Sequence, residues 1–159
     1  MNNYKLNTLI LLTLAFIATS CGGGSTENAE KETVAEPAKI ISLEDAEKDW
    51  KTNYGVGPVK SLELPAEIDQ AMADAGQVVY EAKCTACHKI EKKFIGPSPK
   101  GILDRRTPAW VMNMILDPEG MVATDPIARG LLMKFSAPMA NQSLTEEEAR
   151  SVVEYFRTL

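Results

Sequence analysis

Two cysteines and a histidine form the most chemically specific pattern in the sequence. Cys84 and Cys87 are separated by two residues, and His88 follows directly. Two thiols at this spacing can bond to the two vinyl groups of one porphyrin, while the adjacent imidazole ligates the iron. The pattern C-x-x-C-H is a signature of covalent haem attachment. The sequence therefore predicts one c-type haem, attached through Cys84 and Cys87, with His88 as an axial ligand of the iron.

Other kinds of cysteine chemistry fit these residues less well. A thioredoxin-like dithiol is expected where strands and helices alternate, and the sequence has no such pattern. A structural zinc site takes four nitrogen or sulfur ligands, whereas the chain offers only one further cysteine, Cys21, and no second histidine. A Cys84–Cys87 disulfide would be strained and would leave His88 without a role. Haem attachment remains the favoured interpretation.

A six-coordinate haem iron needs a second axial ligand. Because His88 is the single histidine, methionine is the candidate residue type. Methionines at helical spacing more often fill a core, which argues against Met112 and Met114. Met121 and Met139 lie in predicted loops, and Met133 lies in the last turn of a predicted short helix, so these three stay open.

The elements that must position these residues are predicted to be helices. From residue 67, apolar residues recur at steps of three and four up to Cys84, which predicts a helix that leads into the motif. A Pro at the first helical position and a capping box indicate further helix starts; these lie at Thr107-Pro108, Asp125-Pro126 and Thr145 to Glu148. Asp117-Pro118 is expected to end the helix that starts at Pro108. No alternating strand pattern appears, and the domain is predicted to be all-α.

The N-terminal part of the chain has a different composition. Residues 1–20 combine Lys5 with a short apolar run and small residues, which is typical of a signal peptide. The run is shorter than the about 20 apolar residues that a membrane-spanning helix needs. Residues 21–39 are polar and small and predict a flexible tether. Residues 40–66 predict an irregular extension on the surface of a domain formed by residues 67–159.

Cys21 bears on the destination of the protein. Ala18-Thr19-Ser20-Cys21 resembles the lipobox of bacterial lipoproteins, in which the cysteine is lipidated after cleavage. A lone thiol is a liability in an oxidising compartment, so lipidation is favoured over ordinary signal cleavage. We therefore expect an exported protein, periplasmic or otherwise extracytoplasmic, that is lipid-anchored to a membrane through Cys21.

The charge distribution limits the classes of partner. The net charge of −5 argues against nucleic acid as a partner. Basic residues nevertheless dominate the stretch after the motif: Lys89, Lys92, Lys93, Lys100, Arg105 and Arg106 stand against Glu91 and Asp104. Such a stretch can steer an acidic partner toward the protein, although a solvated loop is the commoner meaning of a charged run.

Residues 67–159 resemble the class I cytochromes c. Gly76, Tyr80 and Cys84 stand at the four-residue steps of the family's first helix, where the glycine permits a close crossing with the last helix. The apolar and aromatic contacts on the last helix are matched by Val152 and Tyr155, or by their neighbours Val153 and Phe156. The resemblance implies a class I cytochrome c fold, with N- and C-terminal helices crossing around one covalently bound haem.

Two loops and a basic pair extend the resemblance. Ile95-Gly96-Pro97 resembles the segment whose proline carbonyl accepts the proximal imidazole N–H, which implies that Pro97 orients His88. Pro138-Met139 resembles the loop that delivers the axial methionine, which implies that Met139 is the sixth ligand. The residues Arg105, Arg106 and Trp110 resemble side chains that meet the haem propionates in relatives, with loop charge and helix core as an equal alternative.

These ligands would determine the function. An iron held by His88 and Met139 has no open position for a substrate but can still change its charge. We therefore expect an electron-transfer protein rather than an enzyme, whose redox partners are a membrane respiratory donor and a terminal reductase or oxidase. The alternatives are a haem subunit of a larger respiratory complex, docked through residues 40–66, and a haem domain that binds or senses a gas.

Overall fold

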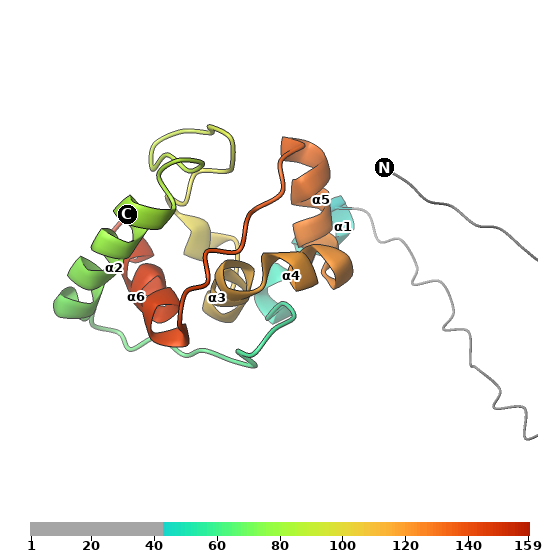
Figure 1. The fold of residues 1–159 in the computed structure, drawn as a ribbon. Coiled ribbons are helices and arrows are strands. Elements are labelled where there is room, and N and C mark those ends of the chain that lie inside the picture. The colour runs from blue at the N-terminus through green and yellow to red at the C-terminus, as the bar shows by residue number, and fades with distance from the viewer. Residues whose placement is uncertain (1–42) are drawn as a thin grey trace, which may run out of the picture. The chain divides into compact units, whose positions relative to one another are not determined.

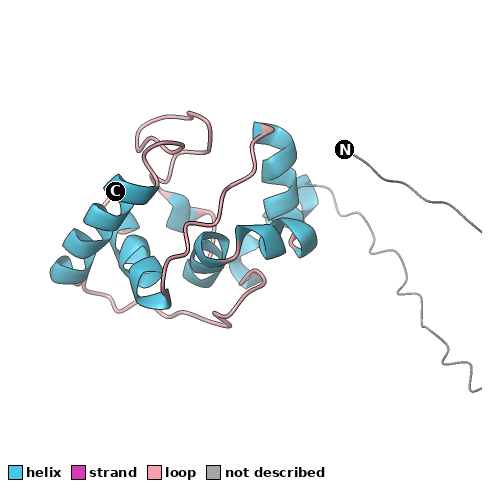
Figure 2. Cartoon of the chain, in the orientation of Figure 1, coloured by secondary structure: helices cyan, strands magenta, loops and turns pink. Residues whose placement is uncertain are grey.

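The computed structural model describes residues 43–159 of the 159-residue chain. This part is helical and contains no strand (Figures 1 and 2). Its α-helices are α1 (Leu43–Lys48), α2 (Gln70–Lys83), α3 (Pro108–Leu116), α4 (Pro118–Thr124), α5 (Pro126–Phe135) and α6 (Glu146–Phe156), and short 3-10 turns lie at Trp50–Thr52 and Ile102–Asp104. The predicted all-α class is confirmed. The predicted signal peptide, the tether, Cys21 and residues 40–42 of the extension lie outside the described residues.

The helix starts indicated by the sequence are present. The side chains of Thr107 and Asp125 accept hydrogen bonds from the backbone N–H groups of Trp110 and Ala128, as N-caps do. Thr145 and Glu148 form the expected capping box at the start of α6. Helix α2 begins a few residues later than its apolar pattern suggests, because the Asp69 side chain caps it by accepting the Met72 N–H.

Helix α4 is not predicted by the sequence pattern. Asp117 ends α3, as expected, but its side chain also accepts the Gly120 N–H and so caps a new helix that begins at Pro118. Met121 therefore lies in a helix rather than in the predicted loop. Its side chain is fully buried.

Helices α2 and α6 cross at very short range (Figure 1). A Cβ atom on Gly76 would lie 1.9 Å from the carbonyl oxygen of Ser151, so only glycine fits this crossing. The ring of Tyr80 on α2 contacts Tyr155 and Phe156 on α6, with ring centroids 5.6 and 5.8 Å apart. The crossing predicted from Gly76 and Tyr80 is confirmed.

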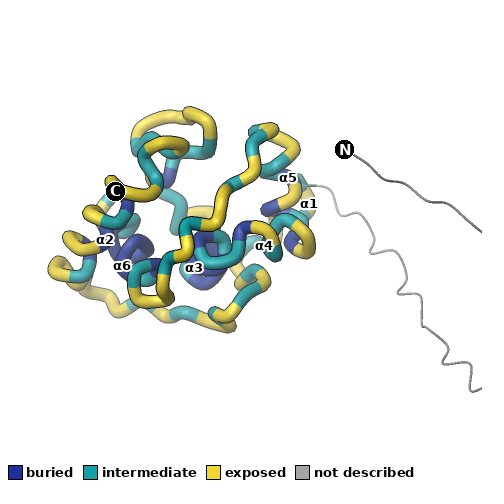
Figure 3. The backbone as a smooth tube through the Cα atoms, viewed as in Figure 1, coloured by how far each residue is buried: buried dark blue, intermediate teal, exposed yellow. Residues whose placement is uncertain are grey.

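The apolar core lies between α3, α4, α5 and α6 (Figure 3). Its buried members share one cluster: Trp110, Val111, Met112, Ile115, Met121, Ile127, Ala128, Ala149, Val152 and Val153. None of the helices in residues 43–159 is long and apolar enough to cross a membrane.

Residues 43–66 differ from a fully irregular extension. They begin with α1 and a 3-10 turn, because Leu43, Ala46 and Trp50 are spaced three and four residues apart and pack against the core. A Cβ atom on Gly130 of α5 would lie 2.6 Å from Leu43 Cδ1, which shows how closely α1 lies against α5. Beyond Thr52 this segment forms no further helix before α2.

Candidate functional site

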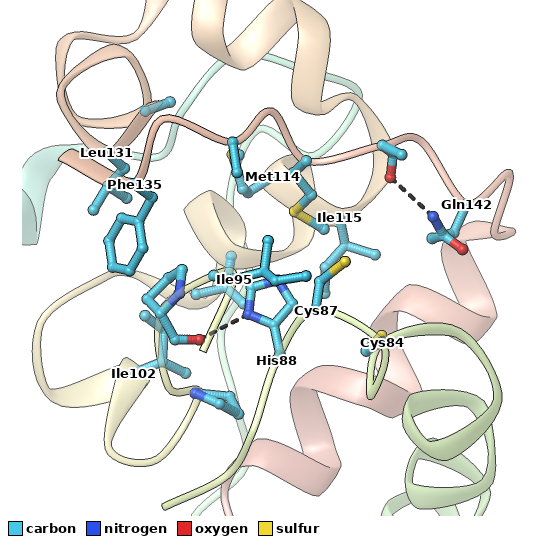
Figure 4. A pocket seen from close by; sticks show the side chains of 18 of the residues that line it. Cys84, Cys87, His88, Ile95, Ile102, Met114, Ile115, Leu131, Phe135 and Gln142 are labelled. Carbon is cyan, nitrogen blue, oxygen red and sulfur yellow. Dashed lines mark hydrogen bonds between the residues drawn. The ribbon is translucent and has the colours of Figure 1, made fainter. Parts of the chain in front are cut away.

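An apolar pocket brings the motif residues together with side chains from α3, α5 and the loops (Figure 4). The empty space in the pocket and in the open solvent at its mouth amounts to about 1280 Å³. Its walls include Ile95, Ile102, Met114, Ile115, Leu131 and Phe135. A pocket of this kind accommodates a large and mostly apolar group.

Both cysteines lie on a tight turn at the end of α2. Cys84 is the C-cap of the helix, and its carbonyl oxygen accepts the backbone N–H groups of Cys87 at 3.1 Å and His88 at 2.9 Å. This turn places both thiols and the imidazole along one wall of the pocket (Figure 4). Burial raises the pKa of the Cys84 thiol, and the neighbouring Cys87 raises it further.

The orientation of the His88 ring is determined by the next loop. Its Nδ1 lies 2.7 Å from the carbonyl oxygen of Pro97. A carbonyl can only accept, so Nδ1 carries a proton, and in the neutral imidazole Nε2 is then the nitrogen whose lone pair can bind a metal. Gly96 permits this arrangement, because a Cβ atom there would lie 2.5 Å from His88 Cε1.

Tyr80 holds the same turn through a hydrogen bond. Its hydroxyl donates to the carbonyl oxygen of His88 at 3.0 Å, and the side chain is 2% exposed. Burial, together with smaller contributions from the nearby Cys84 and Tyr155, raises the pKa of Tyr80 to about 12. The hydroxyl therefore remains a hydrogen-bond donor across the physiological pH range.

The methionines after the motif separate into different environments. Met112 belongs to the buried core, and Met133 is 70% exposed on α5. Met121, fully buried, accepts the backbone N–H of Val56 at its Sδ atom, at 3.0 Å. Only Met114 and Met139 line the pocket.

Met139 reaches the pocket from the loop between α5 and α6. Ser136, at the end of α5, adopts a left-handed conformation with φ of 52°, which ends the helix and starts the loop. Further along, the Asn141 side chain donates to the carbonyl oxygen of Leu116 at 3.1 Å and so attaches the loop to α3. Met114, by contrast, lies within α3 itself.

Arg105, Arg106 and Trp110 lie in different surroundings. Arg105 donates to three backbone carbonyls of the loop that follows Pro97, those of Ser98, Lys100 and Gly101. Arg106 is 5% exposed, pairs with Glu47 at 2.9 Å and lies over the Trp110 ring at 5.4 Å. Of these three residues only Trp110 lines the pocket.

Comparison with known proteins agrees with this geometry. The sequence model of the cytochrome c family matches residues 73–159, which include the motif, the pocket loops and α6. The chain belongs to the cytochrome c family. The cytochrome c-551 of Ectopseudomonas mendocina is 30% identical over 87 residues, which are 54% of this chain and 98% of that protein.

Solved structures of cytochromes c have the same arrangement. A cytochrome c from Rhodothermus marinus is 38% identical and superimposes with a TM-score of 0.63. The matched region is 64% of this chain and 88% of the Rhodothermus marinus chain. An engineered form of that cytochrome c, bound to a carbene intermediate, gives a TM-score of 0.60 at 38% identity, over 64% of this chain and 88% of that one. The fold is that of a class I cytochrome c.

Cytochromes c carry one covalently bound c-type haem with its iron. The residues of this cytochrome c fit such a group: the pocket is mostly apolar, two thiols lie on its wall, and the contact of His88 Nδ1 with Pro97 leaves Nε2 as the ring nitrogen that can bind the iron. Sequence reasoning found these residues from their spacing. It missed the contribution of residues 53–59, which contact the pocket-lining helices from outside the family match.

Proposed function

We propose that this cytochrome c is an extracytoplasmic one-electron carrier whose haem iron is ligated by His88 and Met139, with the haem attached through Cys84 and Cys87. The observation that carries the proposal is the Pro97 carbonyl at 2.7 Å from His88 Nδ1, because it leaves Nε2 as the metal-binding atom. Pro97 then serves to orient the ligand. An outer contact of this kind also raises the basicity of a ligating imidazole.

Met139 is proposed as the opposite ligand on two grounds. It lines the pocket and it comes from a loop, where a side chain can be aimed without disturbing a packed helix face. Met121 and Met133 are less suitable as axial ligands. Met121 is buried in the core, where its Sδ atom accepts the Val56 N–H, and Met133 is exposed to solvent. Met114 is the remaining competitor within the pocket.

A haem held in this way supplies an iron that alternates between the ferric and ferrous states. The protein contributes a fixed His and Met ligand set, a mostly apolar wall and no open coordination position. Thioether ligation raises the reduction potential relative to two imidazoles. These properties suit electron transfer and offer no site for a substrate, which supports a carrier rather than an enzyme.

The ligand assignment can be tested by absorption spectroscopy of the oxidised holoprotein. Met–iron ligation gives a weak long-wavelength band, which the Met139→Ala variant should lose. Met114→Leu is the matched control, since it alters the other pocket methionine and should keep the band. Loss of the band in Met114→Leu alone would reverse the assignment, and a wild-type high-spin iron that binds carbon monoxide readily would refute the carrier proposal.

The proposed partners are a membrane respiratory donor and a terminal reductase or oxidase. Basic side chains around the pocket support partners with acidic docking surfaces: Lys93 lies 4.9 Å over the ring of Phe135, which lines the pocket, and Lys89 lies 5.2 Å over Phe94. Opposite charge on the two surfaces would speed their encounter.

Lipid attachment at Cys21 would confine this carrier to the membrane surface and raise its effective concentration near membrane partners. Mass spectrometry of the mature N-terminus tests this part separately. A lipidated Cys21 is expected, and the Cys21→Ser variant should move from the membrane fraction to the soluble one. An unmodified N-terminus downstream of Cys21 would show that the protein has no such anchor.

A further inference from the structure

A short segment ahead of α2 contacts the helices that line the haem pocket. This segment, residues 53–59, is called the strap below, and it lies outside the residues matched by the cytochrome c family. Its first residue, Asn53, donates from its side-chain amide to Asp125 Oδ2 at 2.7 Å, and its carbonyl oxygen accepts the Thr107 hydroxyl at 2.6 Å. Asp125 and Thr107 are the N-caps of α5 and α3. One strap residue therefore contacts both caps.

Asp125 connects Asn53 to a residue that lines the pocket. Its other oxygen, Oδ1, accepts the Trp110 indole N–H at 3.1 Å and the Ala128 backbone N–H at 2.8 Å. Asp125 and Trp110 are each 3% exposed, and Trp110 lines the pocket. The buried carboxylate thus bridges a residue outside the family match and an aromatic wall of the haem site.

The rest of the strap is fitted to the same helix pair. The Asn113 side chain, fully buried on α3, donates to the carbonyl oxygens of Tyr54 and Val59 and accepts the Val59 N–H. Gly55 has φ of 73°, and a Cβ atom there would lie 3.3 Å from Trp110 Cδ1 and 2.8 Å from Met121 Sδ. Such a set of buried, satisfied hydrogen bonds is specific to one geometry.

We propose that Asn53 is a positioning residue for Trp110, acting through Asp125, and that the strap thereby helps to set the reduction potential of the haem. The inference requires a haem in the pocket but not the carrier role or any partner. Without the Asn53 amide, Asp125 Oδ2 loses this hydrogen-bond donor. A buried carboxylate oxygen without a donor is costly, so the residues around Asp125 should rearrange to admit water. Water at the Trp110 wall makes the haem surroundings more polar, which favours the ferric state and lowers the potential.

The Asn53→Ala holoprotein tests the first step. Proton exchange at the Trp110 indole N–H, followed by NMR, should be faster than in the wild type, while amide exchange in α2 and α6 stays unchanged. Spectroelectrochemical titration should give a lower reduction potential. Thr52→Ala is the matched control, since it removes a side-chain hydrogen bond to Asp49 from the neighbouring residue and should leave both measurements unchanged.

A double-mutant cycle separates positioning from general destabilisation. Trp110→Phe keeps an aromatic ring but removes the indole N–H, so it should lower the potential by itself. If Asn53 acts through Trp110, the Asn53→Ala, Trp110→Phe double variant should shift the potential no further than the larger of the single shifts. Additive shifts, or an unchanged potential in Asn53→Ala, would overturn the proposal. Should Asn53→Ala fail to fold, an unchanged potential in Trp110→Phe would overturn it as well.

Discussion

Gly76 of α2 lies directly against the backbone of Ser151 on α6, and a Cβ atom on Gly76 would lie 1.9 Å from the Ser151 carbonyl oxygen. Backbone meets backbone here, so no side-chain rotation can relieve an added methyl group. The crossing in turn supports Tyr80, whose hydroxyl holds the His88 carbonyl. The absence of a side-chain carbon at Gly76 thus allows the helix crossing that supports the turn carrying the haem motif.

The Gly76→Ala variant should therefore be destabilised despite the better helix propensity of alanine. Overpacking in a closely packed region costs about 1–3 kcal/mol, and alanine recovers about 1 kcal/mol of that in a helix. Because the clash is with backbone atoms, the cost should lie near the upper end of this range, and we expect a net loss of about 2 kcal/mol in the free energy of unfolding. Denaturant titration of the holoprotein would measure it. Gln77→Ala, on an exposed position of the same helix, should change it by less than about 0.5 kcal/mol. Equal stability of Gly76→Ala and wild type would contradict the close crossing.

Much of the helical fold can be predicted because its signals are local. Thr107, Asp125 and Thr145 precede their helices directly and cap them with their own side chains. Helix α4 escapes prediction because Asp117-Pro118 is a stop signal for one helix and a start signal for the next. The same pair of residues has both meanings, and only the three-dimensional path shows that the chain uses both.

The Gly96→Ala variant should disturb His88, the proposed iron ligand, rather than the fold. A Cβ atom at this position would lie 2.5 Å from His88 Cε1, so the imidazole must move away from its hydrogen bond with Pro97. We expect a smaller fraction of six-coordinate low-spin iron in the oxidised protein, measured by absorption and electron paramagnetic resonance spectroscopy. Lys92→Ala, an exposed residue of the same loop, should give the wild-type spectrum. A fully low-spin Gly96→Ala protein would show that the contact does not hold the ring.

The site divides into parts that are readable from the sequence and parts that are not. Cys84, Cys87 and His88 are adjacent, so their spacing alone indicates their chemistry. The methionines after the motif cannot be ranked in this way, because burial of Met121 and exposure of Met133 depend on tertiary packing. Asn53 and Asp125 are 72 positions apart, and no local pattern relates them.

Glu154 provides a prediction for the dependence of stability on pH. Its side chain is fully buried on α6, 2.6 Å from Arg150 and 2.5 Å from Arg157, and it accepts the Asp69 N–H at the start of α2. Burial by itself raises the pKa of this carboxyl group, but the hydrogen bonds and the two guanidinium groups outweigh burial and lower the pKa. A lowered pKa in the folded state means that the ionised form stabilises the fold.

The Glu154→Gln variant should accordingly lose about 3 kcal/mol of unfolding free energy at neutral pH, because two partly buried guanidinium groups lose their counter-charge. This contribution is fully present above the unfolded pKa of about 4.3 and disappears as the pH falls through the lower pKa of the folded state. The gap between wild type and variant, measured by denaturant titration, should therefore be constant near neutrality and narrow in acid. The exposed Glu147→Gln variant is the control and should show no such gap. A gap that persists unchanged in strong acid would contradict this role for the ionised carboxylate.

The basic rim of the pocket should control the rate of electron exchange with charged reagents. Lys89 and Lys93 lie against Phe94 and Phe135, whereas the chain as a whole carries a net charge of −5. If electrons leave near this rim, the anion ferricyanide should oxidise the Lys89→Gln, Lys93→Gln double variant about tenfold more slowly than the wild type at low ionic strength. A cationic cobalt complex should react faster with the same variant.

Added salt should remove both differences, since charges are screened beyond about 10 Å at 0.1 M. Stopped-flow measurements would test this, with the Lys51→Gln, Lys60→Gln double variant as the control, which makes the same charge change at two exposed lysines within residues 43–66. Equal rates for rim and control variants would place the route of electron transfer elsewhere on the surface.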